Sequence, residues 1–194
     1  MNRIDQALRR VARDLNDAGV PFALVGGLAV SSWVEPRFTR DVDLAVAVAS
    51  DDEAQQLILR LTRLGYQIVA LVEQEAVHRL ATVRLMPPGP TTEGLLVDLL
   101  FASSGVEPEL VQGATSLELL PGLAIRVARA EHLLALKILS LDDRRRPQDR
   151  VDVLALLPIL NEPQLDDARQ LLALIERRGY HRGKNLVAEL DALR

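Results

Sequence analysis

Apolar residues in the first third of the chain follow the spacing of a helix and then of a strand, twice over. In the first segment they recur every three or four residues, and Gly19 follows as a stop signal. A short apolar run then breaks at Gly26 and Gly27, and β-branched residues alternate further on. In order, the pattern predicts a helix at 3–18, a strand at 20–25, a brief helix at 28–34, a strand at 41–48 and a helix from 51 to about 64.

The rest of the chain divides into a pair of strands and a helical stretch. Two strands are predicted at 79–85 and 95–101, as a hairpin whose wide loop holds the Pro-Pro-Gly-Pro turn at 87–90. After Gly122 the apolar spacing becomes helical, and it predicts helices at 128–141, 148–160, 164–177 and 184–193. We therefore predict an α+β protein with a small sheet and flanking helices at 1–127 and a helical C-terminal portion at 128–194 packed on them.

The composition excludes several classes of protein. The 194 residues are 48% hydrophobic and 26% charged, which is ordinary for a globular protein with one sizeable core. Cysteine is absent, so disulfide frameworks, thiolate metal sites and cysteine nucleophiles are excluded. The first residues lack the apolar stretch of a signal peptide, and no apolar run is long enough to span a membrane. We expect a cytoplasmic protein without membrane contact.

The charge balance argues against a protein that coats nucleic acid. The formal net charge is -4 and aromatic residues make up 3%, so neither a basic surface nor a base-stacking platform is expected. The one concentrated basic run is Arg144 to Arg146 with Arg150. Such a run is usually a solvated helix end, but it is also where the phosphates of an RNA would be contacted.

Three aspartates are the strongest candidates for chemistry. Asp41 and Asp43 are two residues apart in a predicted strand, which places both carboxylates on one face. Asp98 lies inside an apolar strand, where an ionised carboxylate is costly unless it is paired or binds a cation. Oxygen-only ligands suit Mg²⁺ or Mn²⁺. Alternatively, Asp41 pairs with Arg37 or Arg40, and Asp98 accepts a hydrogen bond from a backbone amide.

Gly26 and Gly27 are a weaker signal. A diglycine between a strand and a helix allows a ligand to approach the backbone closely, and N–H groups that open a helix can bind phosphate. Two glycines in a tight turn are more often needed only for the path of the chain. The pair gains weight because an Asp-x-Asp strand begins 14 residues further on.

These residues together resemble the signature of the DNA polymerase beta superfamily of nucleotidyltransferases. That signature is a strand, a Gly-Gly or Gly-Ser turn, a short helix, an Asp-x-Asp strand and a third aspartate on a neighbouring strand. The matching stretches are 24–30 (LVGGLAV) and 36–44 (PRFTRDVDL). Within the superfamily the chain is most similar to AbiEii-type nucleotidyltransferases, the toxin halves of some bacterial toxin–antitoxin and phage-defence systems. The resemblance implies a nucleotidyltransferase fold.

A second part of the resemblance lies in the helical portion. AbiEii-type proteins carry a helical lysine and a downstream Lys/Arg-Asp-x-x-Asp motif in this region, and the similar stretches here are 133–139 (LLALKIL), 144–146 (RRR) and 149–153 (DRVDV). Lys137 shares its helix face with leucines, so we expect its ammonium group to emerge from an apolar surround and to meet a triphosphate; alternatively it extends to water. Asp149 falls in a first helical turn after Pro147, where the helix dipole favours a carboxylate regardless of function.

The resemblance implies an Mg²⁺-dependent (or Mn²⁺-dependent) transfer of a nucleoside monophosphate from an NTP to a hydroxyl. In this interpretation Asp41, Asp43 and Asp98 hold the metals, with Asp98 also a candidate to take the proton of the hydroxyl, and Lys137 offsets the charge of the triphosphate. The remaining nucleotide contacts would come from Gly26, Gly27, Ser31, Arg37, Thr39 and Asp149. Many relatives have Ser or Thr after the glycine pair; this chain has Leu28, so a hydroxyl contact must come from Ser31 or Ser32, or be absent.

The acceptor is open at this point. Related proteins modify tRNA ends, protein hydroxyls or small antibiotics, and the arginine run favours an RNA acceptor. The alternatives are an antibiotic nucleotidyltransferase, a non-catalytic module of the same fold bound to an antitoxin-like partner, and a plain RNA-binding adaptor. The intact aspartates argue against the module, and the acidic total argues against the adaptor.

Overall fold

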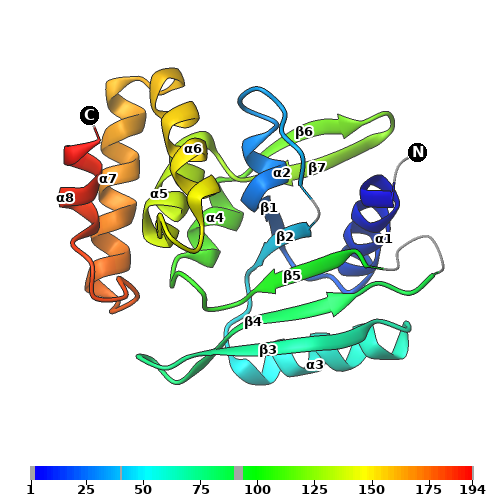
Figure 1. Cartoon of the computed structure of the whole chain (residues 1–194). Helices are drawn as coiled ribbons and strands as arrows, with labels where there is room; N and C mark the ends of the chain where they lie inside the picture. The colour runs from blue at the N-terminus through cyan, green and yellow to red at the C-terminus, as the bar shows by residue number, and fades with distance from the viewer. Residues whose placement is uncertain (1–2, 40, 90–93, 194) are drawn as a thin grey trace.

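A single mixed sheet organises the chain in the computed structural model, which describes residues 3–39, 41–89 and 94–193. Seven strands lie in the order β3-β4-β5-β2-β1-β7-β6, and Figure 1 shows the sheet curving past the N-terminal helix. The strands are β1 (Phe22–Val25), β2 (Asp41–Val46), β3 (Gln67–Gln74), β4 (Arg79–Met86), β5 (Leu96–Leu100), β6 (Thr115–Leu120) and β7 (Leu123–Val127).

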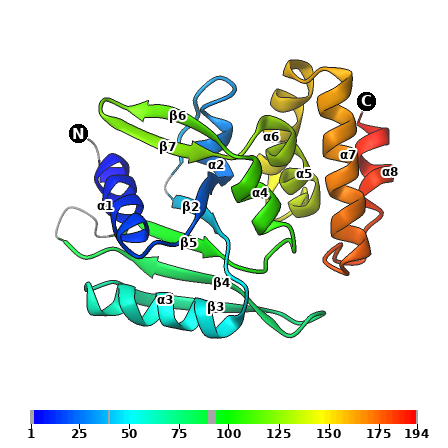
Figure 2. The ribbon, with the colours of Figure 1, turned by 180° about the vertical axis from the view of Figure 1, so that it is seen from behind.

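Some helices cover the sheet, and others form a stack beside it. They are α1 (Arg3–Asp17), α2 (Gly26–Val30), α3 (Asp51–Arg63), α4 (Glu107–Gly113), α5 (Ala130–Ser140), α6 (Pro147–Leu156), α7 (Glu162–Arg177) and α8 (Leu186–Ala192), with a 3₁₀ turn at Leu157–Ile159. Seen from behind, α3 and α4 lie in front of the sheet, and α5 to α8 form a stack beside it (Figure 2). None of the described helices is long and apolar enough to cross a membrane.

The α+β prediction is confirmed, and so are the elements with a strong apolar period. The predicted hairpin is present, since β4 and β5 pair antiparallel; Pro90, in its loop, lies outside the described residues. In β2 the alternation places Val42, Leu44 and Val46 in the core with no exposed surface. The described chain changes from strands to helices after Val127, as expected, and a hydrogen bond from Trp33 Nε1 to the Ala128 carbonyl (2.9 Å) ties the helices to α2. A division into two domains there stays a prediction.

Four elements were not predicted, and two predicted helices have other bounds. The strands β3, β6 and β7 and the short helix α4 were missed; β3 and β6 are edge strands, and little of either is buried. The helix predicted at 28–34 begins at Gly26 and ends at Val30, and the Ser31 hydroxyl donates to the Gly27 carbonyl (3.0 Å) just beyond its end. The helix predicted at 148–160 tightens into the 3₁₀ turn near its end, where Pro158 lacks an amide donor.

Candidate active site

The diglycine turn holds two charged side chains close to the backbone. Gly26 has φ +68°, a conformation that favours glycine, and a Cβ at this position would overlap the Asp43 carboxylate. A Cβ on Gly27 would come within 2.9 Å of Arg37 Nη2. Gly26 therefore favours glycine both for its backbone and for space, whereas the group that approaches Gly27 is the end of a flexible arginine side chain.

One row of residues crosses the sheet at the end of β1. Val25 is in register with Asp43 on β2, Asp43 with Asp98 on β5, and Asp98 with Arg84 on β4. Asp41 lies two residues before Asp43 on the same strand, opposite Leu96, and is also partly buried. The sheet thus brings the three predicted aspartates to one region, next to the diglycine turn.

Negative charge accumulates at Asp43. Burial, together with the charges of Asp98 and Asp41, raises the pKa of its carboxyl group to about 6, although Lys137 acts in the opposite direction. Within the described ranges, no group of three or more acidic or histidine side chains is arranged to hold a metal ion as it stands. The assignment of all three aspartates as metal ligands stays a prediction.

The carboxylate of Asp98 already has a partner. Arg84 donates two hydrogen bonds to it, Nε to Oδ1 at 2.8 Å and Nη2 to Oδ2 at 2.7 Å. Asp98 is 8% exposed and lies between the fully buried Val97 and Leu99. The cost of burying this charge is therefore met by a bidentate ion pair, which the sequence analysis did not consider.

Lys137 lies in a second charged cluster, on the helical side of the site. Its ammonium group is bonded to Asp149 Oδ1 at 2.7 Å and to Asp152 Oδ2 at 2.8 Å, both from α6. Arg37 binds the two oxygens of Asp152 at 2.7 Å each, and Arg146 contacts Asp149 at 3.0 Å. Lys137 does emerge from an apolar surround as expected, but carboxylates of α6 compensate its charge in this structure.

The same cluster fixes the charge state of Asp152. Burial by itself raises the pKa of this carboxyl group, but the hydrogen bonds from Arg37 and Lys137 outweigh burial, and the pKa lies below its usual value. Asp149 lies in the first turn of its helix, as predicted, and is 3% exposed; α6 begins at Pro147, one residue before the predicted start.

The structure gives less information about the remaining residues that were predicted to contact the nucleotide. The Ser31 hydroxyl donates to the Gly27 carbonyl and accepts from the Arg37 amide (3.3 Å), so in this structure it braces the loop after α2. The Ser32 hydroxyl donates to the Ala29 carbonyl (2.6 Å). Thr39 is partly buried in the loop that leads into β2; Arg40, the alternative partner of Asp41, lies outside the described residues. The roles of Ser31 and Thr39 stay predictions.

A small cavity joins the two charged regions. It measures about 110 Å³, and its lining includes Gly26, Asp43, Lys137, Arg146 and Arg182. Arg182, from the connection between α7 and α8, donates to the Ser103 carbonyl at 3.3 Å. Partial burial and the charge of Arg146 lower the pKa of the Arg182 guanidinium. The cavity therefore has carboxylate on one wall and cationic groups on the other.

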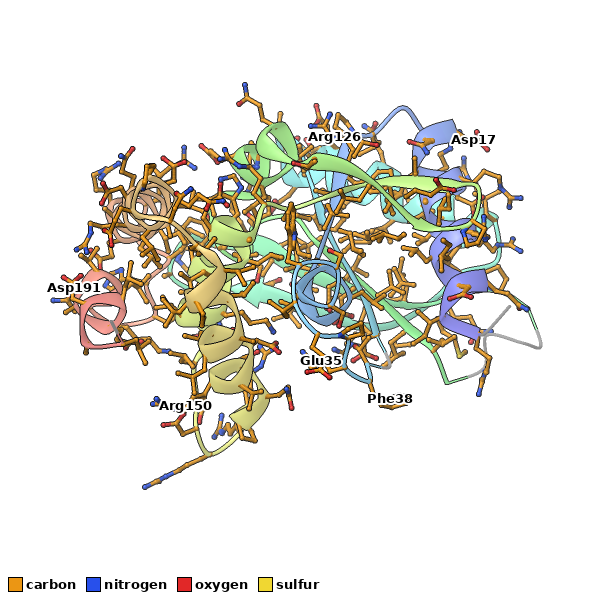
Figure 3. All side chains as sticks on the ribbon, turned by 90° about the horizontal axis from the view of Figure 1, so that it is seen from above. Asp17, Glu35, Phe38, Arg126, Arg150 and Asp191 are labelled. Carbon is orange, nitrogen blue, oxygen red and sulfur yellow. The ribbon has the colours of Figure 1, made fainter. Side chains whose placement is uncertain are left out.

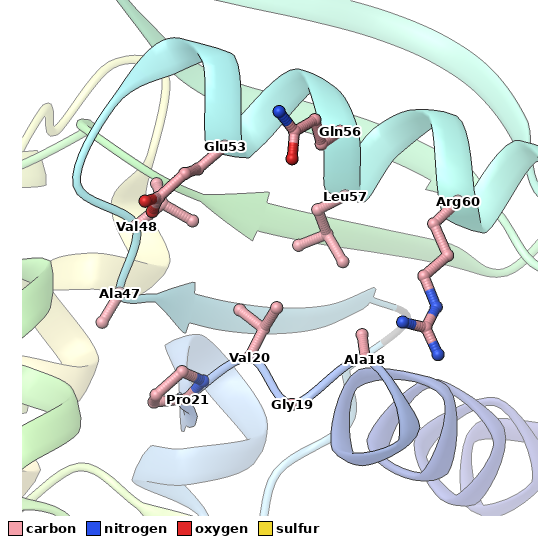
Figure 4. A pocket seen from close by; sticks show the side chains of 10 residues that line it. All are labelled: Ala18, Gly19, Val20, Pro21, Ala47, Val48, Glu53, Gln56, Leu57 and Arg60. Atoms are coloured by element: carbon pink, nitrogen blue, oxygen red, sulfur yellow. The ribbon is translucent and has the colours of Figure 1, made fainter.

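A larger cavity, of about 400 Å³, lies at the opposite end of β1, between α1 and α3 (Figure 4). Its two ionic side chains are already bonded to the backbone, Glu53 by the Ala49 amide (2.8 Å) and Arg60 to the Asp17 carbonyl. We therefore place the candidate active site at the smaller cavity.

Most of the basic run does not line the cavity. Arg150 forms an exposed ion pair with Asp143 (2.8 Å) and lies on the outer side of α6 (Figure 3). Arg144 and Arg145 are exposed and precede α6. Only Arg146 of the run lines the cavity.

Four site residues were missed by the sequence analysis. Asp152 was inside the quoted motif and Arg146 inside the quoted run, so both had a signal. Arg84 is one polar residue of an alternating strand, and its partner depends on a register that the sequence does not give. Arg182, at φ +54° in the connection between α7 and α8, had no signal.

The family of the chain follows from a comparison with family models. Residues 6–193 match the model described as nucleotidyl transferase AbiEii toxin, type IV TA system. The chain belongs to the AbiEii family. This confirms the resemblance stated on residues 24–30, 36–44, 133–139 and 149–153, and it makes the protein a transferase of the nucleotidyltransferase type. None of the curated proteins matches the chain.

Solved structures confirm that this AbiEii family member has the nucleotidyltransferase fold. An antigenic nucleotidyltransferase-like protein from Paracoccidioides brasiliensis is 23% identical, with a TM-score of 0.54 over 96% of this chain and 91% of that one. The solution structure of the antibiotic-resistance factor ANT(2″)-Ia is 14% identical, with a TM-score of 0.59 over 92% and 94%. The crystal structure of ANT(2″)-Ia with adenylyl-2″-tobramycin is 14% identical, with a TM-score of 0.57 over 89% of this chain and 97% of that one.

Proposed function

We propose that this protein transfers a nucleoside monophosphate from an NTP to a hydroxyl acceptor and releases pyrophosphate. The observation that carries the proposal is the shared cavity, where Gly26 of α2 and Asp43 of β2 meet Lys137 of α5. In such a transfer an acceptor oxygen forms a bond to the α-phosphorus while the bond to the pyrophosphate oxygen breaks. Positioning and charge stabilisation are the main tasks of the protein.

Asp41 and Asp43 fit a divalent cation. Both supply carboxylate oxygens, the donors that Mg²⁺ prefers, and the pKa of Asp43 is raised first by burial and then by the negative charges of Asp98 and Asp41. Mg²⁺ or Mn²⁺ held there would draw phosphate oxygens toward the site and offset their charge. The two carboxylates would then orient the nucleotide against the diglycine turn.

Lys137, Arg146 and Arg182 are suited to the triphosphate. An ammonium group has three N–H donors, and the bonds to Asp149 and Asp152 use two of them. The third is available toward the cavity that Lys137 lines. Asp149 and Asp152 therefore hold the ammonium in place, and Arg37 in turn holds Asp152, so that these residues support the nucleotide through Lys137.

The acceptor that we propose is RNA, and the biological role is that of the toxin in a toxin–antitoxin pair. The family description supports the toxin role, and the antitoxin would be a separate partner protein. Arg144 and Arg145 are exposed beside Arg146, which lines the cavity. An RNA end held by these two arginines would have its hydroxyl near the cavity.

Label transfer tests this function. The purified protein is incubated with each of four α-labelled NTPs, Mg²⁺ and total RNA, beside Asp43→Asn and a control, Asp166→Asn, whose carboxylate is exposed on α7. We expect the wild type and the control to label RNA and Asp43→Asn to lose about 10³-fold or more. Labelled protein or small molecule instead of RNA would refute the RNA acceptor only. Absence of transfer together with absence of NTP binding would refute the enzyme and favour a non-catalytic module.

A further inference from the structure

Arg84 is the one described cation that is bonded to the row of carboxylates on the sheet. It projects from the middle of β4, in register with Asp98, and its two bonds of 2.8 and 2.7 Å use both oxygens of that carboxylate. Its side chain is 40% exposed, whereas that of Asp98 is 11% exposed. A planar guanidinium fits a carboxylate in this way, and a lysine could not form both bonds.

The influence of Arg84 extends beyond Asp98. The hydrogen bond with Asp98 raises the pKa of Arg84, partial burial opposes it, and the charges of Asp98, Asp41 and Asp43 add to the increase. The guanidinium is therefore the bonded counter-charge of Asp98 on the sheet, whereas Lys137 and Arg146 act on Asp43 from the helical side. Three carboxylates and one guanidinium leave two negative charges, which is the charge that a single divalent cation neutralises.

We infer that Arg84 takes the place of a second cation on Asp98, so that the site binds one divalent ion, on Asp41 and Asp43. The inference rests on the proposed function. It differs from the expectation that Asp98 is a metal ligand. Asp98 then holds Arg84 beside the ion site. Arg84 is a positioning residue, and its removal leaves the buried carboxylate of Asp98 without a partner. That carboxylate would recruit a second ion.

Counting bound Mn²⁺ tests the inference without relying on activity. Mn²⁺ is titrated into the full chain with a non-hydrolysable NTP present, and the free ion is followed by electron paramagnetic resonance. The variants are Arg84→Ala and Arg84→Gln, and the control is Arg79→Ala, which removes an arginine of the same strand that pairs with Asp51 at 3.0 Å. If the alanine variant does not fold, the glutamine variant, which keeps one donor for Asp98, carries the same expectation.

We expect one ion in the wild type and in Arg79→Ala, and two in the Arg84 variants, with the second site tightened more than about tenfold. Asp98→Asn added to Arg84→Gln should remove the second ion. Two ions in the wild type, or one in the Arg84 variants, would overturn the role of Arg84 and leave nucleotidyl transfer standing. If the wild type binds no ion, or only an ion that Asp41→Asn also binds, the metal site of the proposed function would be overturned as well.

Discussion

The two walls of the candidate site differ in their balance of charge. On the sheet wall, three carboxylates meet one described cation, Arg84. On the helical wall, Lys137, Arg37 and Arg146 meet the two carboxylates of Asp149 and Asp152. The sheet wall is short of positive charge and the helical wall has an excess, so the first is suited to a cation and the second to an anion. An NTP with a divalent ion would satisfy both walls at once.

The largest effect is expected at the centre of the helical wall. Lys137→Met leaves Asp149 buried with only Arg146 as a partner, and we expect a loss of about 3–5 kcal/mol in the free energy of unfolding. Denaturant unfolding measures this loss. Adding Asp149→Asn to Lys137→Met should recover much of the stability but none of the transfer activity. Recovery of transfer in the double variant would show that Lys137 serves the fold alone.

A matched pair of glycine substitutions separates backbone strain from the site. Gly26→Ala and Gly122→Ala both place alanine at φ near +70°, at roughly 1–2 kcal/mol each, but only the first places a Cβ on the Asp43 carboxylate. We therefore expect Gly26→Ala to lose more thermal stability than Gly122→Ala, because only its Cβ meets other atoms, and to show about 10²-fold lower label transfer. Equal transfer rates in the two variants would contradict the placement of Asp43 against the turn.

The arginine from the α7–α8 connection should affect the nucleotide rather than the fold. Arg182→Ala removes a cation from the cavity, and we expect the KM for NTP to rise about tenfold, as for one lost charge-assisted hydrogen bond. Arg178→Ala is the control, since Arg178 also lies between α7 and α8 but pairs with Glu109 at 2.7 Å and does not line the cavity. The same increase in both variants would assign the effect to the connection and not to the phosphates.

The smallest effect is a dependence on pH that originates at Asp43. Its pKa is about 6 in the fold against a usual value of 3.8, so between these values the folded state holds a proton that the unfolded state has lost. The contribution of Asp43 to stability without metal therefore falls as pH rises from about 4 to 6, and the stability difference between the wild type and Asp43→Asn should change accordingly. Mn²⁺ affinity should weaken below pH 6, by up to about tenfold per pH unit. Thermal unfolding and Mn²⁺ titration at several pH values measure both trends.

The sequence predicted different parts of the two walls of the candidate site. The sheet wall was readable because Asp41, Asp43 and the diglycine are close in sequence and fall on a strand and a turn with clear local signals. The role of Arg84 could not be predicted, because its pairing with Asp98 depends on the register of a hairpin with a long loop. On the helical wall Lys137 was identified, but its bonds to Asp149 and Asp152 depend on how α6 packs against α5.

Edge elements were missed for a related reason. β3 is almost wholly exposed and lacks the alternation that marks a half-buried strand. Its place at the sheet edge is set by pairing with β4, and two irregularities in that pairing weaken the period further. Local patterns therefore identified the elements that carry the aspartates and Lys137, and tertiary pairing decided the partners of those residues.

The most direct test of nucleotidyl transfer is the position of the phosphate that the acceptor receives. The wild-type protein is given the same NTP labelled at the α-phosphorus in one reaction and at the γ-phosphorus in another, with Mg²⁺ and total RNA. We expect the α-label to become attached to RNA and the γ-label to leave as pyrophosphate. Attachment of the γ-label would contradict this expectation, because the protein would then transfer a phosphoryl group and not a nucleotide.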